Sequence, residues 1–211
     1  MTLEQQALQY LKDYYHNHPG NEEDKSYRIE HTLRVAAIGK EIAQKENLNE
    51  QAVILGCLLH DIGKYDCEAN KDHGRASAIV ARPLLESLGL SSELADEICH
   101  GIATHVDGKA DDNLEDTILS DTISDCDNID RFDAIRVYQT IQYMDELDKK
   151  PIEERIAILR KRIERLHELY SFKMATKTAA VLFQGKLDIQ LAYYQALLTQ
   201  LESTYILFSA I

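Results

Sequence analysis

Apolar side chains recur along most of the chain at the spacing of amphipathic α-helices. In the segment 26–46, one helical face runs through positions i, i+4, i+8, i+11 and i+15. This face consists of Tyr27, His31, Val35, Ile38 and Ile42. Ser26 is suited to cap the helix, and His31 is expected to point where the core side chains point. No stretch shows the apolar–polar alternation of a β-strand over any length, so the pattern predicts an all-α fold.

Similar spacing predicts further helices before residue 149. They span about 3–15, 50–59, 73–88, 91–105 and 134–147, with a helix-like segment at 114–133. In the first helix the inward positions are Leu3, Ala7, Tyr10 or Leu11, and Tyr14. Asn49 and Asp72 are suited to cap the helices that follow them, and Pro83 should kink or split its helix. The run 53–59 is apolar on every side, which indicates burial in the core.

The sequence Lys149-Lys150-Pro151 marks a boundary, because proline is favoured at the start of a helix. A long helix with a seven-residue apolar repeat follows at about 152–170, and a final helix is expected at about 186–204. We expect a helical domain at 1–148 and, at 149–211, a C-terminal helical hairpin packed on the core. A homodimer contact is the alternative for this hairpin.

Composition excludes several classes of partner. The formal net charge of −13 argues against binding to nucleic acid or to an anionic membrane surface. No apolar run approaches the roughly 20 residues of a membrane span, and the acidic, amphipathic N-terminal segment does not resemble a signal peptide. The four cysteines lie far apart without a CxxC pair, which is typical of reduced thiols in a cytoplasmic protein.

Residues 58–64 read LLHDIGK and carry the strongest chemical signal. Consecutive side chains on a helix point about 100° apart, so His60 and Asp61 can converge only where the buried helix ends. An unpaired carboxylate emerging from a core would be costly. An imidazole and a carboxylate that meet at one point suit a divalent cation, which would offset this cost.

Further histidines and acids follow this motif. His73 opens a helix, His105 closes another, and the segment SDCDNID at 124–130 is crowded with aspartates. Together with His31 and HDIGK, this order resembles the HD-domain metal-dependent phosphohydrolases over about residues 27–138. The resemblance implies an HD-domain helical bundle that binds a divalent transition metal ion, such as Mn, Fe, Ni, Co or Zn, with Mg as a further option.

The resemblance also implies a ligand set. Its members are His31, His60, Asp61 and one downstream aspartate. Cys126-Asp127 fits the family frame with Cys in place of the usual Ala, so Asp127 is the expected fourth ligand, and Asp125 is the alternative. Helical spacing agrees, because Ile123, Asp127 and Asp130 follow i, i+4 and i+7. His73 and His105 match residues that bind a second metal in some members; alternatively, they orient water or hold phosphate.

The reaction implied by the resemblance is attack of metal-activated water on phosphorus. Asp61 and Lys64 are the expected catalytic residues. Lys64 and Arg75 are candidate phosphate contacts, because a lysine can reach back over the site as a point charge. The expected substrate is a nucleotide or another small phosphoester. The alternative is a regulatory or scaffold protein that keeps the fold without the activity; the presence of His31, His60, Asp61 and Lys64 argues against it.

Overall fold

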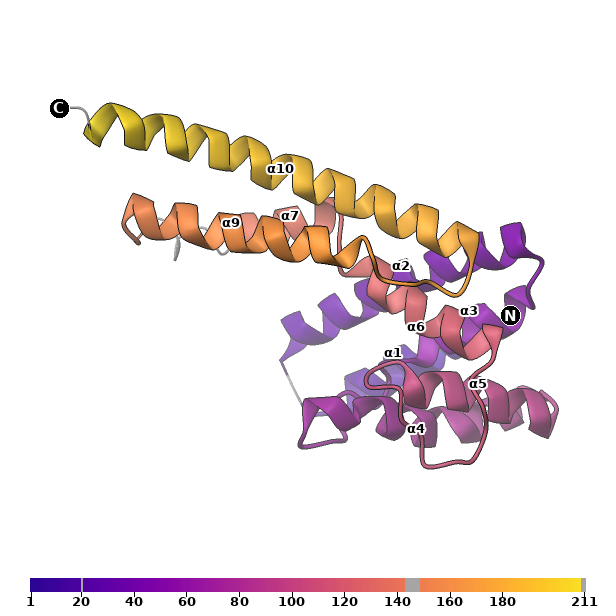
Figure 1. Ribbon diagram of the computed structural model, residues 1–211. Helices are drawn as coiled ribbons and strands as arrows, with labels where there is room; N and C mark the ends of the chain where they lie inside the picture. The colour runs from indigo at the N-terminus through magenta and orange to yellow at the C-terminus, as the bar shows by residue number, and fades with distance from the viewer. Residues whose placement is uncertain (20, 143–148, 210–211) are drawn as a thin grey trace. The chain divides into compact units, whose positions relative to one another are not determined.

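The computed structural model describes residues 1–19, 21–142 and 149–209 (Figure 1). Within these ranges the chain forms α-helices and a short 3₁₀ turn, with no β-strand, so the predicted all-α class is confirmed. The chain divides into two compact units: residues 1–130 together with 174–179, and residues 131–173 together with 180–211. The expected domain division after residue 148 stays a prediction, because compactness alone does not define independently folding domains.

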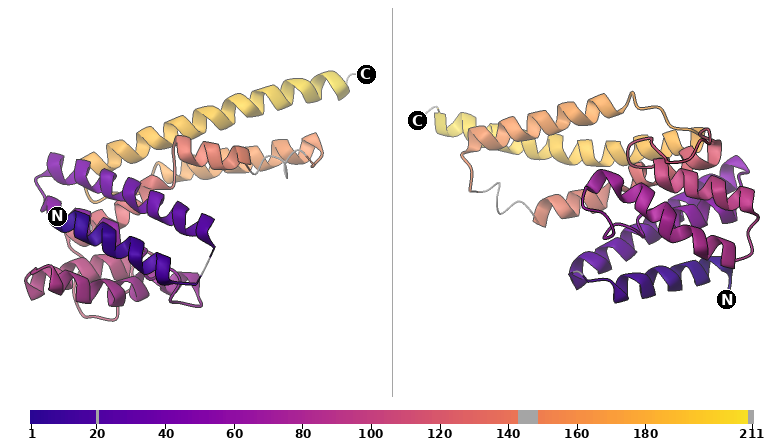
Figure 2. Two further views of the ribbon diagram at one scale, coloured as in Figure 1. Left: turned by 180° about the vertical axis from the view of Figure 1, so that it is seen from behind. Right: turned by 90° about the horizontal axis from the view of Figure 1, so that it is seen from below.

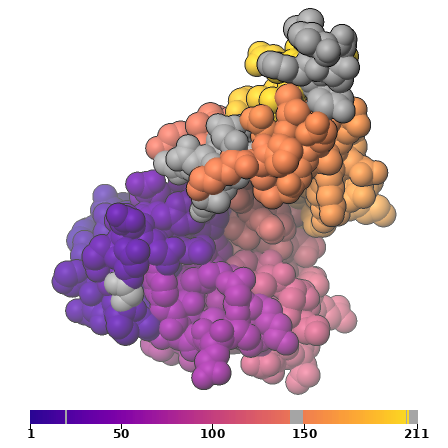
Figure 3. Space-filling view, turned by 90° about the vertical axis from the view of Figure 1, so that its left-hand side faces the viewer, coloured from indigo at the N-terminus to yellow at the C-terminus, as the bar shows by residue number. Residues whose placement is uncertain are grey.

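Unit 1 holds the helices that carry the candidate site residues. They are α1 (Leu3–Asn17), α2 (Glu22–Glu46), α3 (Glu50–Leu59), α4 (His73–Ser87), α5 (Ser92–Thr104) and α6 (Ile118–Asp130). Helix α3 packs against α1, α2, α5 and α6, and its apolar residues are almost all buried, as expected for a helix without a polar face. In Figure 3, the indigo-to-violet atoms of the N-terminal helices adjoin the magenta atoms of the chain that follows them.

Helix α2 begins four residues earlier than Ser26, the expected cap. Asn21 is the N-cap, and its side chain accepts a hydrogen bond from the backbone N–H of Glu23. The acidic first turn (Glu22, Glu23 and Asp24) stabilises this start, because carboxylates interact favourably with the positive end of the helix dipole. The early start adds a full turn before His31.

Helix α1 runs antiparallel to α2 (Figure 2). Its buried face contains Ala7, Leu11 and Tyr15, so Tyr15 and not Tyr14 is the inward tyrosine. Tyr15 is fully buried and donates its hydroxyl hydrogen to the backbone carbonyl of Asp61 at 2.7 Å. The first helix therefore supports the HDIGK segment directly.

Helix α4 is preceded by the 3₁₀ turn Asn70–Asp72 and continues through Pro83, which does not split it. Asp72 makes no side-chain cap hydrogen bond, contrary to expectation, because its carboxylate pairs with Arg75. The expected cap of α3 is confirmed, since the Asn49 side chain accepts from the backbone N–H of Ala52 at 3.2 Å.

Unit 2 contains α7 (Ala134–Gln142), α9 (Ile152–Leu169) and most of α10 (Lys177–Ser209). Helices α9 and α10 run antiparallel, since Tyr170 bonds to Asp188 while Arg160 pairs with Glu202 at 2.7 Å, which confirms the C-terminal hairpin (Figure 1). Helix α10 begins at Lys177, well before the expected start near 186. Residues 143–147 of the helix expected at 134–147 lie outside the described residues. None of the described helices combines the length and apolar character needed to cross a membrane.

Candidate metal centre

The HDIGK segment brings His60 and Asp61 together by ending a helix. Helix α3 stops at Leu59, and a turn follows in which the Ile62 N–H bonds to the Leu59 carbonyl. His60 and Asp61 are 0% and 3% exposed, so both side chains are directed into the protein. This is the geometry that a helix end allows and a helix interior does not.

Gly63 lets this turn lie against the start of α4. A Cβ atom at Gly63 would stand 2.5 Å from backbone atoms of Ala76 and Ser77, which is closer than real Cβ atoms approach. The Gly63 N–H donates to the Ser77 hydroxyl at 2.9 Å. The missing side chain therefore brings Asp61 within reach of His73, the first residue of α4.

Each of the buried histidines in this region presents Nδ1 to a fixed hydrogen-bond acceptor. In three of them the acceptor is the backbone carbonyl three residues earlier. The pairs are His60 with Cys57 (2.8 Å), His105 with Ile102 (2.6 Å) and His73 with Asn70. A carbonyl can only accept, so Nδ1 carries the proton, and the Nε2 of a neutral ring keeps its lone pair. The fourth, His31, presents Nδ1 to the carboxylate of Asp130 at 2.8 Å.

The Nε2 atoms converge on Asp61. The Nε2 atoms of His31 and His60 are 3.2 Å apart, and so are those of His73 and His105. Asp61 Oδ1 lies 3.0 Å from His73 Nε2, and Oδ2 lies 3.9 Å from both His31 Nε2 and His60 Nε2. Two groups whose ligand atoms lie within 4.8 Å of one another result: His31, His60 and Asp61, and Asp61, His73 and His105. We call these the first triad and the second triad; they share Asp61.

Helix α6 separates the two aspartates that the sequence left as alternatives. Asp127 Oδ1 lies 3.1 Å from His31 Nε2 and 3.8 Å from His60 Nε2. Asp125 Oδ2 instead accepts the backbone N–H of Ala175 at 2.7 Å. Asp127 therefore faces the first triad, whereas Asp125 holds the segment 174–179; that Asp127 is a metal ligand stays a prediction.

A family comparison agrees with this arrangement. The model of the HD domain matches residues 28–134, which include about half of the chain and every residue of both triads. This chain belongs to the HD-domain family.

Solved structures resemble this HD-domain protein over nearly its whole length. A predicted HD-superfamily hydrolase from an uncultured Thermotogales bacterium has a TM-score of 0.66 at 19% identity, covering 93% of this chain and 91% of its own. An HD-superfamily hydrolase from Bacillus thuringiensis has a TM-score of 0.67 at 16% identity, with 93% and 95% covered. Bacillus subtilis YpgQ, solved in complex with ADP, has a TM-score of 0.63 at 19% identity, with 94% of each chain covered. At these identities the likeness concerns the fold. A search of curated proteins found no match.

The charges within the HD-domain site are strongly coupled. Complete burial lowers the pKa of His60 to about 4, although Asp61 opposes the shift. Burial would also lower the pKa of His31, but hydrogen bonds to Asp127 and Asp130 raise it to about 9. Burial would raise the pKa of Asp61, yet the imidazoles of His60, His105 and His73 hold it well below its usual value. The Asp61 carboxylate is therefore ionised, as metal binding requires.

Two basic residues lie beside the cluster, and a third candidate, Arg75, pairs with carboxylates outside it. Arg28 Nη1 lies 3.1 Å from Asp61 Oδ2, and Lys64 Nζ lies 3.1 Å from His73 Nδ1. Burial lowers the pKa of Lys64 more than the charge of Asp61 raises it. Arg75 pairs with Asp72 and, at 3.1 Å, with Asp107, so its guanidinium is engaged by partners outside both triads. A phosphate contact by Arg75 stays a prediction that requires these pairs to open.

Sequence reasoning missed three residues of this site. Arg28 and Arg34 lie three positions before and three positions after His31. Arg34 Nε donates a hydrogen bond to the Asp130 carboxylate at 2.9 Å. Helical spacing puts Asp130 on the face of Asp127 but does not indicate its contact with His31. The available signal was this i±3 spacing, which makes residues neighbours on a helix surface.

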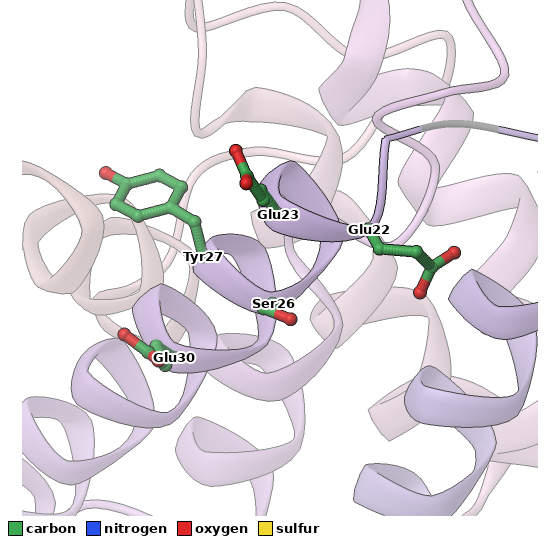
Figure 4. A pocket seen from close by; sticks show the side chains of 5 residues that line it. All are labelled: Glu22, Glu23, Ser26, Tyr27 and Glu30. Atoms are coloured by element: carbon green, nitrogen blue, oxygen red, sulfur yellow. The ribbon is translucent and has the colours of Figure 1, made fainter.

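A shallow pocket of about 430 Å³ lies at the start of α2 (Figure 4). Its described lining contains three acidic side chains, Glu22, Glu23 and Glu30, together with Ser26 and Tyr27. The Tyr27 ring lies nearly parallel to the His31 imidazole, at 9° and 6.2 Å between ring centres. Carboxylates repel anions, so this surface disfavours the binding of a phosphate.

Proposed function

We propose that this HD-domain protein is a metal-dependent phosphohydrolase acting on a nucleotide or another small phosphoester. The observation that carries the proposal is the convergence of four imidazole Nε2 atoms on shared carboxylates, with each Nδ1 atom already anchored. Outer hydrogen bonds of this kind orient histidine ligands in metal sites. Such pre-organisation serves ligand binding more directly than it serves stability.

The donor set fits a divalent cation. The Nε2 atoms of His31 and His60 approach to 3.2 Å, where two lone pairs would repel. A proton on His31 Nε2 could relieve this single repulsion. A cation bound between the imidazoles and carboxylates would satisfy the lone pairs of all these groups together. Imidazole with carboxylate suits Mn, Fe, Co, Ni or Zn, while Mg prefers oxygen ligands, so we favour a transition metal over Mg.

Four residues would hold the first ion: His31, His60, Asp61 and Asp127. His73 and His105 would hold a second ion through Asp61, or would orient water and phosphate if only one ion binds. When bound, a divalent ion would supply an activated water near neutral pH and would polarise a phosphoryl oxygen. Asp61 would contribute a carboxylate ligand to both triads. Lys64 donates hydrogen bonds to the phosphoryl group and offsets its charge as the bond to the leaving oxygen breaks.

The proposed substrate class draws on the comparisons and on charge. Two structural neighbours are described as HD-superfamily hydrolases, and Bacillus subtilis YpgQ binds ADP in its crystal. The net charge of −13 makes a large polyanion a poor partner, whereas a small phosphoester needs only a few local cations. A regulatory or scaffold role without catalysis is the competing function, and it predicts no metal-dependent turnover.

The test combines metal analysis with a substrate screen. Purified protein is analysed for bound metals, stripped, reloaded in turn with Mn²⁺, Co²⁺, Ni²⁺ or Mg²⁺, and assayed against nucleotides and simple phosphoesters. We expect one or two ions per chain and metal-dependent phosphate release. His60→Ala should lose both, and His167→Ala, which removes an exposed histidine from α9, should lose neither. A wild-type protein that binds no divalent ion, or binds it without any turnover, contradicts the proposal.

A further inference from the structure

His31 differs from the other histidines of the cluster in how its Nδ1 is held. His60, His73 and His105 lie at or next to helix ends, and each donates to a neutral carbonyl three residues back. His31 lies inside α2, where backbone carbonyls serve the helix, so its partner must come from another element. That partner is Asp130 at the end of α6, 2.8 Å away and 4% exposed.

Asp130 is itself fixed by a bidentate contact from Arg34. Arg34 Nε lies 2.9 Å from Oδ1 and 3.2 Å from Oδ2, and Nη2 lies 3.0 Å from Oδ2. Both carboxylate oxygens are thus engaged, and the buried negative charge is neutralised by a cation whose side chain is 30% exposed. Planar two-point contacts of this kind hold a carboxylate in one orientation.

A carboxylate acceptor changes the imidazole more than a carbonyl does. It is more basic, so it draws the Nδ1 proton more strongly and makes Nε2 a better electron donor toward a cation. The Arg34 guanidinium offsets part of the Asp130 charge and so limits this effect. Among the histidines of the two triads, only His31 carries such a pair.

We infer that Arg34 and Asp130 are positioning residues that make the first triad the tighter of the two metal-binding halves. This inference rests on the proposed metal dependence. It predicts ordered loading, in which the first ion enters beside His31, His60 and Asp61, and any second ion then binds the weaker second triad. If the protein takes one ion only, that ion occupies the first triad.

Isothermal titration of the stripped protein with Mn²⁺ tests the inference. Asp130→Asn keeps the size of the side chain but removes its charge, and should weaken the tightest binding step about 10- to 100-fold. Any weaker step should stay unchanged. Asp96→Asn is the matched control, because Asp96 pairs with Arg82 on partly exposed faces of α5 and α4, outside both triads. It should leave every step unchanged.

A double variant separates tuning from simple support of the fold. Asp130→Asn leaves the Arg34 guanidinium without its carboxylate, so the single variant will also lower the melting temperature. Arg34→Gln combined with Asp130→Asn removes the pair as a unit and should recover stability while the tightest step stays weak. Recovery of metal affinity together with stability would show that the pair only supports the fold, and the inference would be wrong.

A readout without metal completes the test. The His31 Nδ1–H proton, bonded to a carboxylate, should give a downfield imidazole resonance in the stripped protein that disappears in Asp130→Asn. An unchanged tightest step in Asp130→Asn overturns the inference but leaves the proposed function standing. Failure of the wild-type protein to bind Mn²⁺, Co²⁺ or Ni²⁺ overturns the proposed function, and the inference with it.

Discussion

Gly63 gives the sharpest mechanical test of how the HDIGK segment builds the site. In Gly63→Ala, the new methyl group would start 2.5 Å from backbone atoms of Ala76 and Ser77, whereas ordinary contact begins at 3.4 Å. The turn and α4 must therefore separate by about 1 Å, the difference between these distances. The atoms that meet the new methyl group belong to the backbone, which cannot rotate away as a flexible side chain can. The start of α4 must therefore move, and His73 moves away from Asp61 with it.

The expected loss of stability follows from two opposing effects. Inserting a methyl group into a filled interior costs about 1–3 kcal/mol. Replacing glycine with alanine also restricts the unfolded chain, which returns about 0.4–1 kcal/mol. With both effects near the middle of their ranges, the net loss is about 1–2 kcal/mol. This corresponds to a fall in melting temperature of about 2–8 °C for a protein of this size.

Thermal unfolding and Mn²⁺ titration measure the two consequences. Displacement of α4 lengthens the 3.0 Å contact between Asp61 and His73, so the second triad should lose more metal affinity than the first. Gly185→Ala on α10 is the matched control, because a Cβ atom there meets nothing within 4 Å. It should stabilise its helix by about 0.5–1 kcal/mol. A Gly63→Ala protein with wild-type stability and wild-type metal affinities would refute the reasoning.

Four further substitutions separate the roles of the site residues. Asp61→Ala removes the carboxylate shared by both triads, so elemental analysis should find no bound metal. Lys64→Ala should keep its metal but lower kcat at least tenfold in a steady-state assay, because it removes a transition-state contact; metal loss would contradict this role. Asp127→Asn should weaken Mn²⁺ binding at least tenfold by titration, whereas Asp125→Asn should leave it unchanged, since Asp125 bonds to Ala175. Equal losses in these two variants would mean that both carboxylates reach the cation.

The local pattern of the sequence determined the helices and the character of the site. Helical spacing placed His31 on the apolar face of α2, and the buried run before His60 indicated that a histidine and an aspartate emerge from the core. Spacing on α6 also put Asp127 on the face of Ile123. These predictions succeeded because a helix repeats every 3.6 residues, so the relative direction of nearby side chains follows from sequence alone.

Packing between helices decided which distant residues meet. The start of α2 at Asn21, the pairing of Arg75 with Asp107 and the support of His31 by Asp130 depend on contacts between separate elements. His31 and Asp130 are 99 residues apart in the chain, and no short-range spacing relates them. The sequence supplied the chemical groups of a metal centre. Only the tertiary structure set their partners, because the convergence of side chains from α2, α3, α4, α5 and α6 is a property of how these helices pack.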